Sequence, residues 1–315
     1  MEKITQNKKQ VFLEHLANVY PDHFQKIVQE LQHIRHLTFR INSLCQNSIS
    51  AKELLELGYD VKNTEYFKSF FLNSLPEKSI SHDDAVQAGQ IYIQGLSSMI
   101  PAYELDPKPG ENIMDLCAAP GSKTSLLADI SHNKANITAA DNNFGRLNAT
   151  KANLQALNVQ NVTFIKSDAS VLSRNPEYIN RFDKVLADVP CSNEGLIRDL
   201  DNYDFTYWNP KLAKHLPNLQ KRILASGIQM LKPGGTLVYS TCTYSPEENE
   251  EVADWALRKF PDIALAELNF SAPNTTPGLT AWKNKELNPT LSKTLRVLPN
   301  ELFDGFYVAK FVKRA

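Results

Sequence analysis

The feature that most constrains this chain is a series of short apolar runs, each followed by a helical pattern, that begins near residue 110. Strands that alternate with helices predict an α/β fold with a doubly wound, mostly parallel sheet. The runs expected to form its strands are 112–117, 137–140, 162–165, 185–187 and 236–240. Residues 296–299 and 305–311 are expected to close the chain as an antiparallel hairpin at the edge of this sheet.

The first 83 residues follow a different pattern, and we expect them to form a small α+β appendage to a main domain at 84–315. Apolar residues recur at helical spacing from residue 8 to 37, and Pro21 divides them into two helices. Residues 37–44 alternate like a strand, and Ser50 fits the N-cap of a helix that ends at Gly58. Lysines, arginines and histidines tilt this segment toward positive charge, which fits either nucleic-acid contact or an ordinary solvated helix face.

Bulk composition narrows the class of protein. With 42% hydrophobic residues, 22% charged residues and a net charge of −1, the chain reads as a globular protein rather than one that coats polyanions. Neither a membrane-spanning run nor a signal peptide is expected. The cysteines are widely spaced and form no C-x-x-C pair, which argues against a zinc site or a disulfide framework. We therefore expect a cytoplasmic protein without a metal. A monomer is expected because no exposed apolar repeat suggests otherwise.

Reactive side chains follow the ends of two of the predicted strands. Asp188 and Cys191 come directly after 185–187, where Pro190 must end the strand, and Cys242 follows 236–240. Ligands of open α/β sheets bind beyond the carboxyl ends of the strands, so these side chains are expected to share one rim. Asp188 and Cys191 alone also fit a strand end with a capping acid and an inert thiol. The matching cysteine on a second strand favours a functional site.

A second candidate site lies at the turn after residues 112–117. A turn that contains Gly121 leads into a predicted helix at 125–130, and such a turn offers backbone N–H groups to a ligand. A P-loop is excluded because Ser122 separates Gly121 from Lys123, and G-x-G-x-x-G is also absent. Asp141 ends the next strand about 20 residues later, where a carboxylate holds the ribose in nucleoside-binding folds. The alternative is a structural cap on the following helix.

Several segments of the chain resemble the NOL1/NOP2/Sun (RsmB/RsmF-like) family of RNA cytosine-5 methyltransferases. They are MDLCAAPGSKT, ADVPCS, STCTYSPEENE, TFRINSL, IYIQGLSSM and RVLP with DGFYVAK, and the similarity spans roughly residues 37–315. The resemblance implies a Rossmann-like domain that depends on S-adenosylmethionine, and an appendage that recognises RNA. The chain departs from the family pattern in two places. Where the family has C-S-G-x-G, residues 191–195 read C-S-N-E-G, so only the second glycine is kept, and this is expected to alter the shape of the loop near the base. In the other, no separate recognition domain follows the closing hairpin, which leaves RNA selection to the appendage and the rim.

The implied activity is methylation of C5 of a cytosine in ribosomal or transfer RNA through a covalent bond from cysteine to C6. The residues alone do not choose between Cys191 and Cys242 as nucleophile. The resemblance assigns the attack to Cys242 and assistance in product release to Cys191. It further implies that Asp188 and Lys123 contact the flipped base.

The implied S-adenosylmethionine site is larger. Asp141 would hold the ribose, Arg146 would help to fix that end, and Asp168 would face the adenine. The full set expected to bind the cofactor is Cys117, Ala118, Ala119, Pro120, Gly121, Lys123, Asp141, Arg146, Asp168 and Asp188.

RNA is the expected partner, and Arg40, Lys151 and Arg198 are the residues expected to contact its phosphates. Two other functions fit the same fold. One is an RNA-bound scaffold without methyl transfer, against which the intact pair of cysteines argues. The other is methylation of DNA or of a small molecule, which substrate competition would distinguish.

Overall fold

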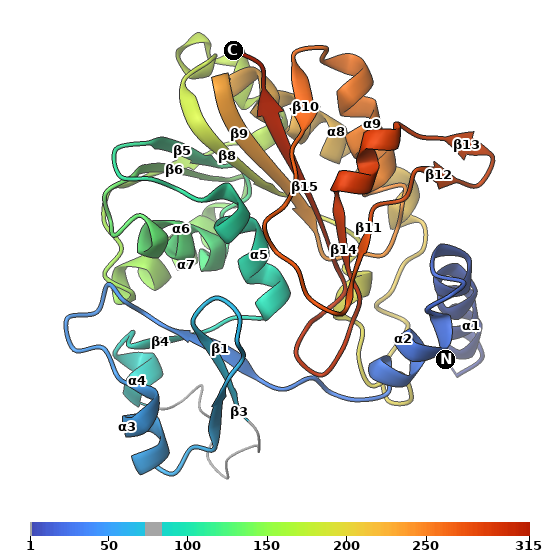
Figure 1. Ribbon diagram of the computed structural model, residues 1–315, viewed down its shortest axis with the longest axis horizontal. Helices are drawn as coiled ribbons and strands as arrows, with labels where there is room; N and C mark the ends of the chain where they lie inside the picture. Colours follow the sequence, from blue (N-terminus) through green and yellow to red (C-terminus); the bar gives the residue numbers. More distant parts are fainter. Residues whose placement is uncertain (1, 73–83) are drawn as a thin grey trace.

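The computed structural model describes residues 2–72 and 84–315, and for residues 2–6 only the backbone. Its large sheet has the order β11-β14-β15-β9-β8-β5-β6-β7, with β10 paired to β15 (Figure 1). The parallel strands are β5 (Asn112–Asp115), β6 (Asn136–Asp141), β7 (Val162–Lys166), β8 (Phe182–Asp188) and β9 (Leu231–Thr241). The antiparallel strands are β10 (Ile263–Leu265), β11 (Thr275–Pro277), β14 (Leu295–Val297) and β15 (Phe306–Lys313). The predicted α/β class is confirmed.

Helices cover both faces of the large sheet. They are α5 (Leu96–Leu105), α6 (Ser122–Ile130), α7 (Phe144–Ala156), α8 (Leu212–Met230) and α9 (Glu250–Lys259). Successive residues of a strand point to opposite faces, so Val185 packs in the core with α8 while Leu186 packs in the core with α5 and α6. Because both faces are covered, the parallel strands are nearly continuous apolar runs, which is why they stand out in the sequence.

Two predicted elements differ in the structure. The strand predicted at 236–240 begins earlier, because residues 232–235 also belong to β9, and the pairing of β8 with β9 shifts register between Phe182 and Lys184. Pro233 lacks an N–H and Gly234 has a φ of +78°, so the start of this strand looks like a turn in the sequence. The closing hairpin of β14 and β15 forms, but it is not at the edge, because β15 pairs with β9 and β11 lies outside β14.

The amino-terminal segment contains two helices and a small sheet. The helices are α1 (Glu2–Val19) and α2 (Phe24–Leu31), separated at Pro21 as predicted. The sheet has the order β2-β3-β1-β4, and its strands are β1 (Thr38–Ile41), β2 (Val61–Asn63), β3 (Ser69–Leu72) and β4 (Ile91–Ile93). Helices α3 (Ala51–Glu56) and α4 (Asp84–Gln87) accompany it, and Ser50 caps α3 as expected.

The predicted division between residues 83 and 84 needs correction at both ends of the appendage. Phe12 on α1 is fully buried against Phe205 and Trp208, so α1 belongs to the main core rather than to the small sheet. Strand β4, expected in the main domain, pairs with β1. Figure 1 shows α1 and α2 on one side of the molecule and the small sheet on the other. Residues 73–83, where the division was placed, lie outside the described residues.

Among the residues that the structure describes, no helix is both long and apolar enough to cross a bilayer.

Candidate active site

The parallel pairing of β8 with β9 brings the two predicted cysteines together. Asp188 pairs with Ser240 in this register, so the residues that follow each strand leave the sheet side by side. Ser192 and Thr243 are joined by a hydrogen bond of 2.7 Å between their hydroxyl groups, and Gly195 N–H donates to Cys242 O at 2.9 Å. Two loops that are far apart in the sequence are thereby held against each other at the carboxyl ends of the strands.

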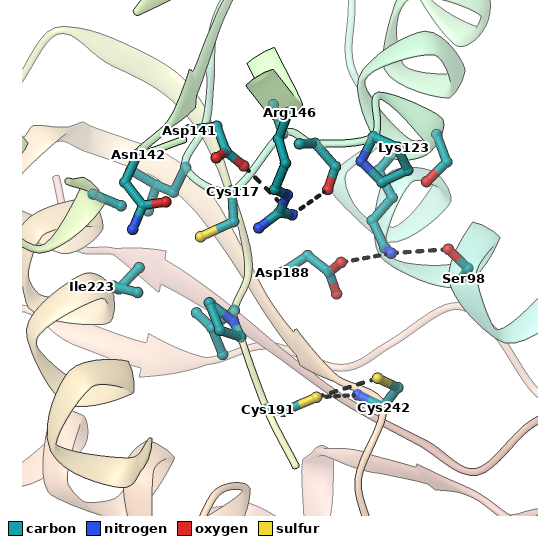
Figure 2. Close-up of a pocket in the computed structure, with 18 of the residues that line it drawn as sticks. Ser98, Cys117, Lys123, Asp141, Asn142, Arg146, Asp188, Cys191, Ile223 and Cys242 are labelled. Atoms are coloured by element: carbon teal, nitrogen blue, oxygen red, sulfur yellow. Dashed lines mark hydrogen bonds and ion pairs between the residues drawn. The ribbon is translucent and has the colours of Figure 1, made fainter. Parts of the chain in front are cut away.

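The sulfur atoms of Cys191 and Cys242 lie 3.2 Å apart (Figure 2). Cys242 N–H also donates to Cys191 Sγ at 3.3 Å. The hydrogen bond to Cys242 and then burial raise the pKa of Cys191 well above its usual value. Cys191 therefore remains a thiol near neutral pH and is able to donate its proton to the neighbouring sulfur.

An aspartate and a lysine line the same cavity. Asp188 Oδ2 is 2.7 Å from Lys123 Nζ, and Asp188 Oδ1 accepts a hydrogen bond of 2.7 Å from Ser240. Lys123 Nζ also donates to Ser98 Oγ at 2.9 Å (Figure 2). Burial opposes the charge of Lys123, but the attraction of Asp188 outweighs it and raises the pKa of Lys123. The lysine stays cationic beside a fixed carboxylate.

A second acidic position lies at the end of β6. Asp141 is buried; its Oδ1 accepts a hydrogen bond from Asn143 N–H at 2.9 Å, and its Oδ2 is 3.5 Å from Arg146. Arg146 also donates to the carbonyl of Ala119 at 2.9 Å, which ties this end of the cavity to the turn after β5. Asp168 is exposed and caps the short helix that follows β7, through Ser170 N–H at 2.9 Å.

A buried acid ends β5, and the turn that leads to α6 carries a half-buried thiol. Asp115 accepts a hydrogen bond from Thr124 Oγ1 at 2.7 Å, and burial raises its pKa to about 6. Burial also raises the pKa of Cys117 well above its usual value, which favours the protonated thiol over the reactive thiolate. Gly121 has a φ of +98° and starts α6, and a Cβ there would lie 3.1 Å from Thr150.

The structure brings nearly all of the predicted catalytic and cofactor-binding residues into one cavity of about 470 Å³. Those that line it are Cys117, Ala118, Ala119, Pro120, Lys123, Asp141, Arg146, Asp168, Asp188, Cys191 and Cys242. Gly121 does not line it but sets the path of the turn. The volume suits a nucleoside-sized ligand. Figure 2 shows Cys191 and Cys242 at one end of the cavity, Asp141 and Cys117 at the other, and Asp188 between them.

Comparison with known proteins identifies the family. A family model described as 16S rRNA methyltransferase RsmB/F matches residues 102–312. The chain is 36% identical to a tRNA (cytosine(49)-C(5))-methyltransferase of Pyrococcus abyssi over 88% of each chain. It is 36% identical to ribosomal RNA small subunit methyltransferase F of Cronobacter sakazakii over 72% of this chain and 46% of that one. A solved structure of a methyltransferase homolog from Pyrococcus horikoshii superimposes with a TM-score of 0.82 at 34% identity, covering 95% and 93% of the two chains.

The chain belongs to the NOL1/NOP2/Sun family of RNA cytosine-5 methyltransferases. Its cofactor is S-adenosylmethionine, as in the family. The residues present fit that cofactor, because a buried carboxylate, Asp141, faces a cavity of nucleoside size beside a turn at a helix N-terminus. Asp141, Arg146 and the turn at 117–123 would hold it.

Two of the three residues predicted to contact phosphates are not available for that role. Arg40 is 2% exposed, and its guanidinium binds Asp129 at 2.9 Å and Ser125 at 2.7 Å, which joins the small sheet to α6. Arg198 is enclosed by Asp304 and by backbone carbonyls, among them Glu30 O at 3.3 Å. Both side chains satisfy buried acceptors, so the prediction of phosphate contact is wrong for them.

Lys151 is exposed on α7, and its Nζ lies 5.3 Å from the centre of the Phe164 ring. Its contact with RNA stays a prediction.

Some residues of the site could not be assigned from the sequence. Ser98 binds Lys123, Ser240 binds Asp188, and Asn193 contacts both thiols. Ser98 and Ser240 lie within the segments that resemble the family, so the segments were found but not the roles of these side chains. The register of β8 and β9 brings Ser240 to Asp188, whereas the packing of α5 on α6 brings Ser98 to Lys123.

Proposed function

We propose that this enzyme methylates C5 of a cytosine in ribosomal or transfer RNA through a covalent adduct between Cys242 and C6 of the base. The observation that carries the proposal is the pair of sulfur atoms 3.2 Å apart, at one end of a cavity that also holds Asp188 and Lys123. The Pyrococcus abyssi relative is named for a tRNA cytosine and the Cronobacter sakazakii relative for ribosomal RNA, which supports both classes of RNA.

A thiol is needed because C5 of cytosine is a poor nucleophile. Addition of the Cys242 sulfur at C6 makes the ring electron-rich at C5, so one difficult step becomes two easier ones. S-adenosylmethionine, when bound, supplies the methyl group as a sulfonium that C5 can attack. Cys242 must lose its proton to add and regain one when the carbon–sulfur bond breaks.

Cys191 is suited to the release of the product. After methylation, the proton on C5 must be removed before Cys242 can leave C6. Cys191 Sγ lies 3.2 Å from Cys242 Sγ, so it is close to both the adduct and the leaving sulfur. Its raised pKa keeps Cys191 protonated at rest, so it can accept the C5 proton only after it has given up its own. Once deprotonated, the same raised pKa makes its thiolate a strong base for that proton.

Asp188 and Lys123 orient the base. A carboxylate held by Lys123 and Ser240 presents a fixed acceptor to the exocyclic amino group of cytosine. Lys123 keeps its charge beside this acid and contributes a cation near the ring while charge develops on it.

Incubation of the purified protein with tRNA and with ribosomal RNA transcripts, using labelled S-adenosylmethionine, tests the proposal. We expect label at C5 of a defined cytosine in one of the two RNAs, and none with the Cys242→Ala variant. Full turnover by Cys242→Ala would contradict the assignment of the nucleophile. Binding of RNA by the wild-type protein without transfer to any RNA would favour a scaffold, and label only on DNA would overturn the substrate.

A further inference from the structure

Asn193 contacts both thiols from a loop that does not need its side chain. Asn193 Oδ1 lies 3.1 Å from Cys242 Sγ and 3.6 Å from Cys191 Sγ. Its backbone is left-handed, with φ 58° and ψ 24°, a conformation that asparagine tolerates and that glycine adopts without cost. The turn would therefore form with glycine, and the amide is an addition to it.

The loop that carries Asn193 is rigidly held. The neighbouring Glu194 is buried and accepts hydrogen bonds from Trp208 Nε1 at 3.2 Å and from Thr243 Oγ1 at 3.0 Å. A Cβ on Gly195 would lie 1.9 Å from Gly305 O, so the backbone is closely packed on this side as well. With its neighbours fixed, Asn193 presents its amide to the thiols from a defined position.

We propose that Asn193 is a positioning residue for the thiol pair. Its side-chain carbonyl oxygen accepts a hydrogen bond from the S–H group of Cys242 and lies within reach of Cys191, and so favours the S–H form of Cys242 and directs it into the cavity until the base arrives. A hydrogen bond to the protonated form of an acid favours that form, so loss of the amide makes the thiolate easier to form. The inference rests on the proposed function only in taking Cys242 as the nucleophile.

Other titratable groups surround the thiols, and they stay the same when residue 193 changes. They are Lys123 from α6, Asp188 from β8, Tyr239 from β9 and Glu248 from the segment before α9. Their charges contribute equally to every variant at position 193. A difference among such variants therefore reports the contact with residue 193 itself.

The test is the pH dependence of alkylation of Cys242 by iodoacetamide, measured by peptide mass spectrometry on the full-length protein without RNA or cofactor. For Asn193→Gly we expect alkylation of Cys242 at pH 7.5 to be roughly 2- to 10-fold faster, the range of one net hydrogen bond. For Asn193→Asp we expect slower alkylation than in the wild type, because a carboxylate binds the S–H more strongly and repels the thiolate. The alkylation rate of Cys191, whose sulfur lies farther from Asn193 Oδ1, should change less.

Asn158→Gly is the matched control, because Asn158 is also left-handed, with φ 56°, and lies outside the cavity. It should leave the alkylation of Cys242 unchanged. Coincident profiles for Asn193→Gly and the wild type would overturn the proposal, as would equal shifts in the same direction for the glycine and aspartate variants. The assay needs no methyl transfer, so its failure is distinguishable from failure of the proposed function, which a missing covalent adduct would show.

Discussion

Asp188 is the residue that we propose orients the base. Its two oxygens are bound by Lys123 and Ser240, each at 2.7 Å, so the acceptor is already in place before the base enters. We expect Asp188→Asn to lower kcat/KM for methyl transfer by at least about 100-fold, the usual effect of losing a fixed polar group that acts on the transition state. Ser240→Ala removes one neutral hydrogen-bond partner of Asp188 and should lower kcat/KM by less than about tenfold. Wild-type activity in Asp188→Asn would contradict this role.

Asp115 makes the stability of the fold depend on pH. Burial raises its pKa from the usual 3.8 to about 6, so the folded protein favours the protonated acid. The stability that this proton contributes is present below about pH 4 and is lost as the pH rises through about 6. Relative to Asp115→Asn, the wild type should lose up to about 3 kcal/mol of unfolding free energy between pH 4 and pH 7. If urea titrations show the same change of unfolding free energy with pH for the wild type and for Asp115→Asn, the raised pKa of Asp115 is contradicted.

At the residue scale, the sequence predicts the groups that perform chemistry better than those that support them. Cys191, Cys242 and Asp188 follow recognisable strand ends, and the structure places them in one cavity. Arg40 was misassigned because a charged residue is exposed far more often than it is buried, and its buried partner Asp129 is 89 residues away.

At the element scale, the five parallel strands were predictable because strands covered on both faces are short apolar runs. The pairing of β8 with β9 was not, although it decides which side chains meet at the cavity. Pairing depends on how the whole sheet packs, and the single run that contains a strand does not reveal its partner. The same reason explains why β14 and β15 were expected at the edge, whereas β15 lies between β9 and β14.

A buried ion pair joins three elements. Arg296 on β14 binds Glu250 on α9 through Nε at 2.6 Å, and its Nη1 donates to the Tyr20 hydroxyl at 2.7 Å, just after α1. Arg296→Met leaves the Glu250 carboxylate buried without its partner, and we expect it to cost about 3–5 kcal/mol of unfolding free energy. Lys52→Met, which removes an ion pair whose two side chains are 85% and 64% exposed, should cost less than about 1 kcal/mol of unfolding free energy. Equal midpoints in chemical denaturation would contradict this difference.

At the scale of the whole molecule, α1 is part of the main core. Phe12 is fully buried among Phe205, Trp208 and Tyr244. Phe12→Ala should therefore cost about 3–5 kcal/mol of unfolding free energy and lower the midpoint of the main unfolding transition. Val11→Ala, on the exposed side of the same helix, should cost less than about 1 kcal/mol. If α1 were an independent appendage, both variants would leave the main unfolding transition unchanged.

The division of the chain was less predictable than its fold. Helical periodicity correctly placed α1 and α2, but it shows only that a helix has an apolar face, not which core that face joins. Likewise β4 reads as a strand, while its partner β1 is some 50 residues earlier. Long-range packing therefore decides where the small sheet ends.

The measurement that tests the central claim most directly is covalent trapping of RNA by the Cys191→Ala variant. The protein is incubated with RNA and labelled S-adenosylmethionine and then separated on a denaturing gel. Because Cys191 is proposed to assist release of the methylated base, its loss should leave a labelled protein–RNA adduct that survives denaturation. The double variant Cys191→Ala/Cys242→Ala should form none. An adduct that persists in the double variant, or turnover by Cys191→Ala at the wild-type rate without an adduct, would contradict the account.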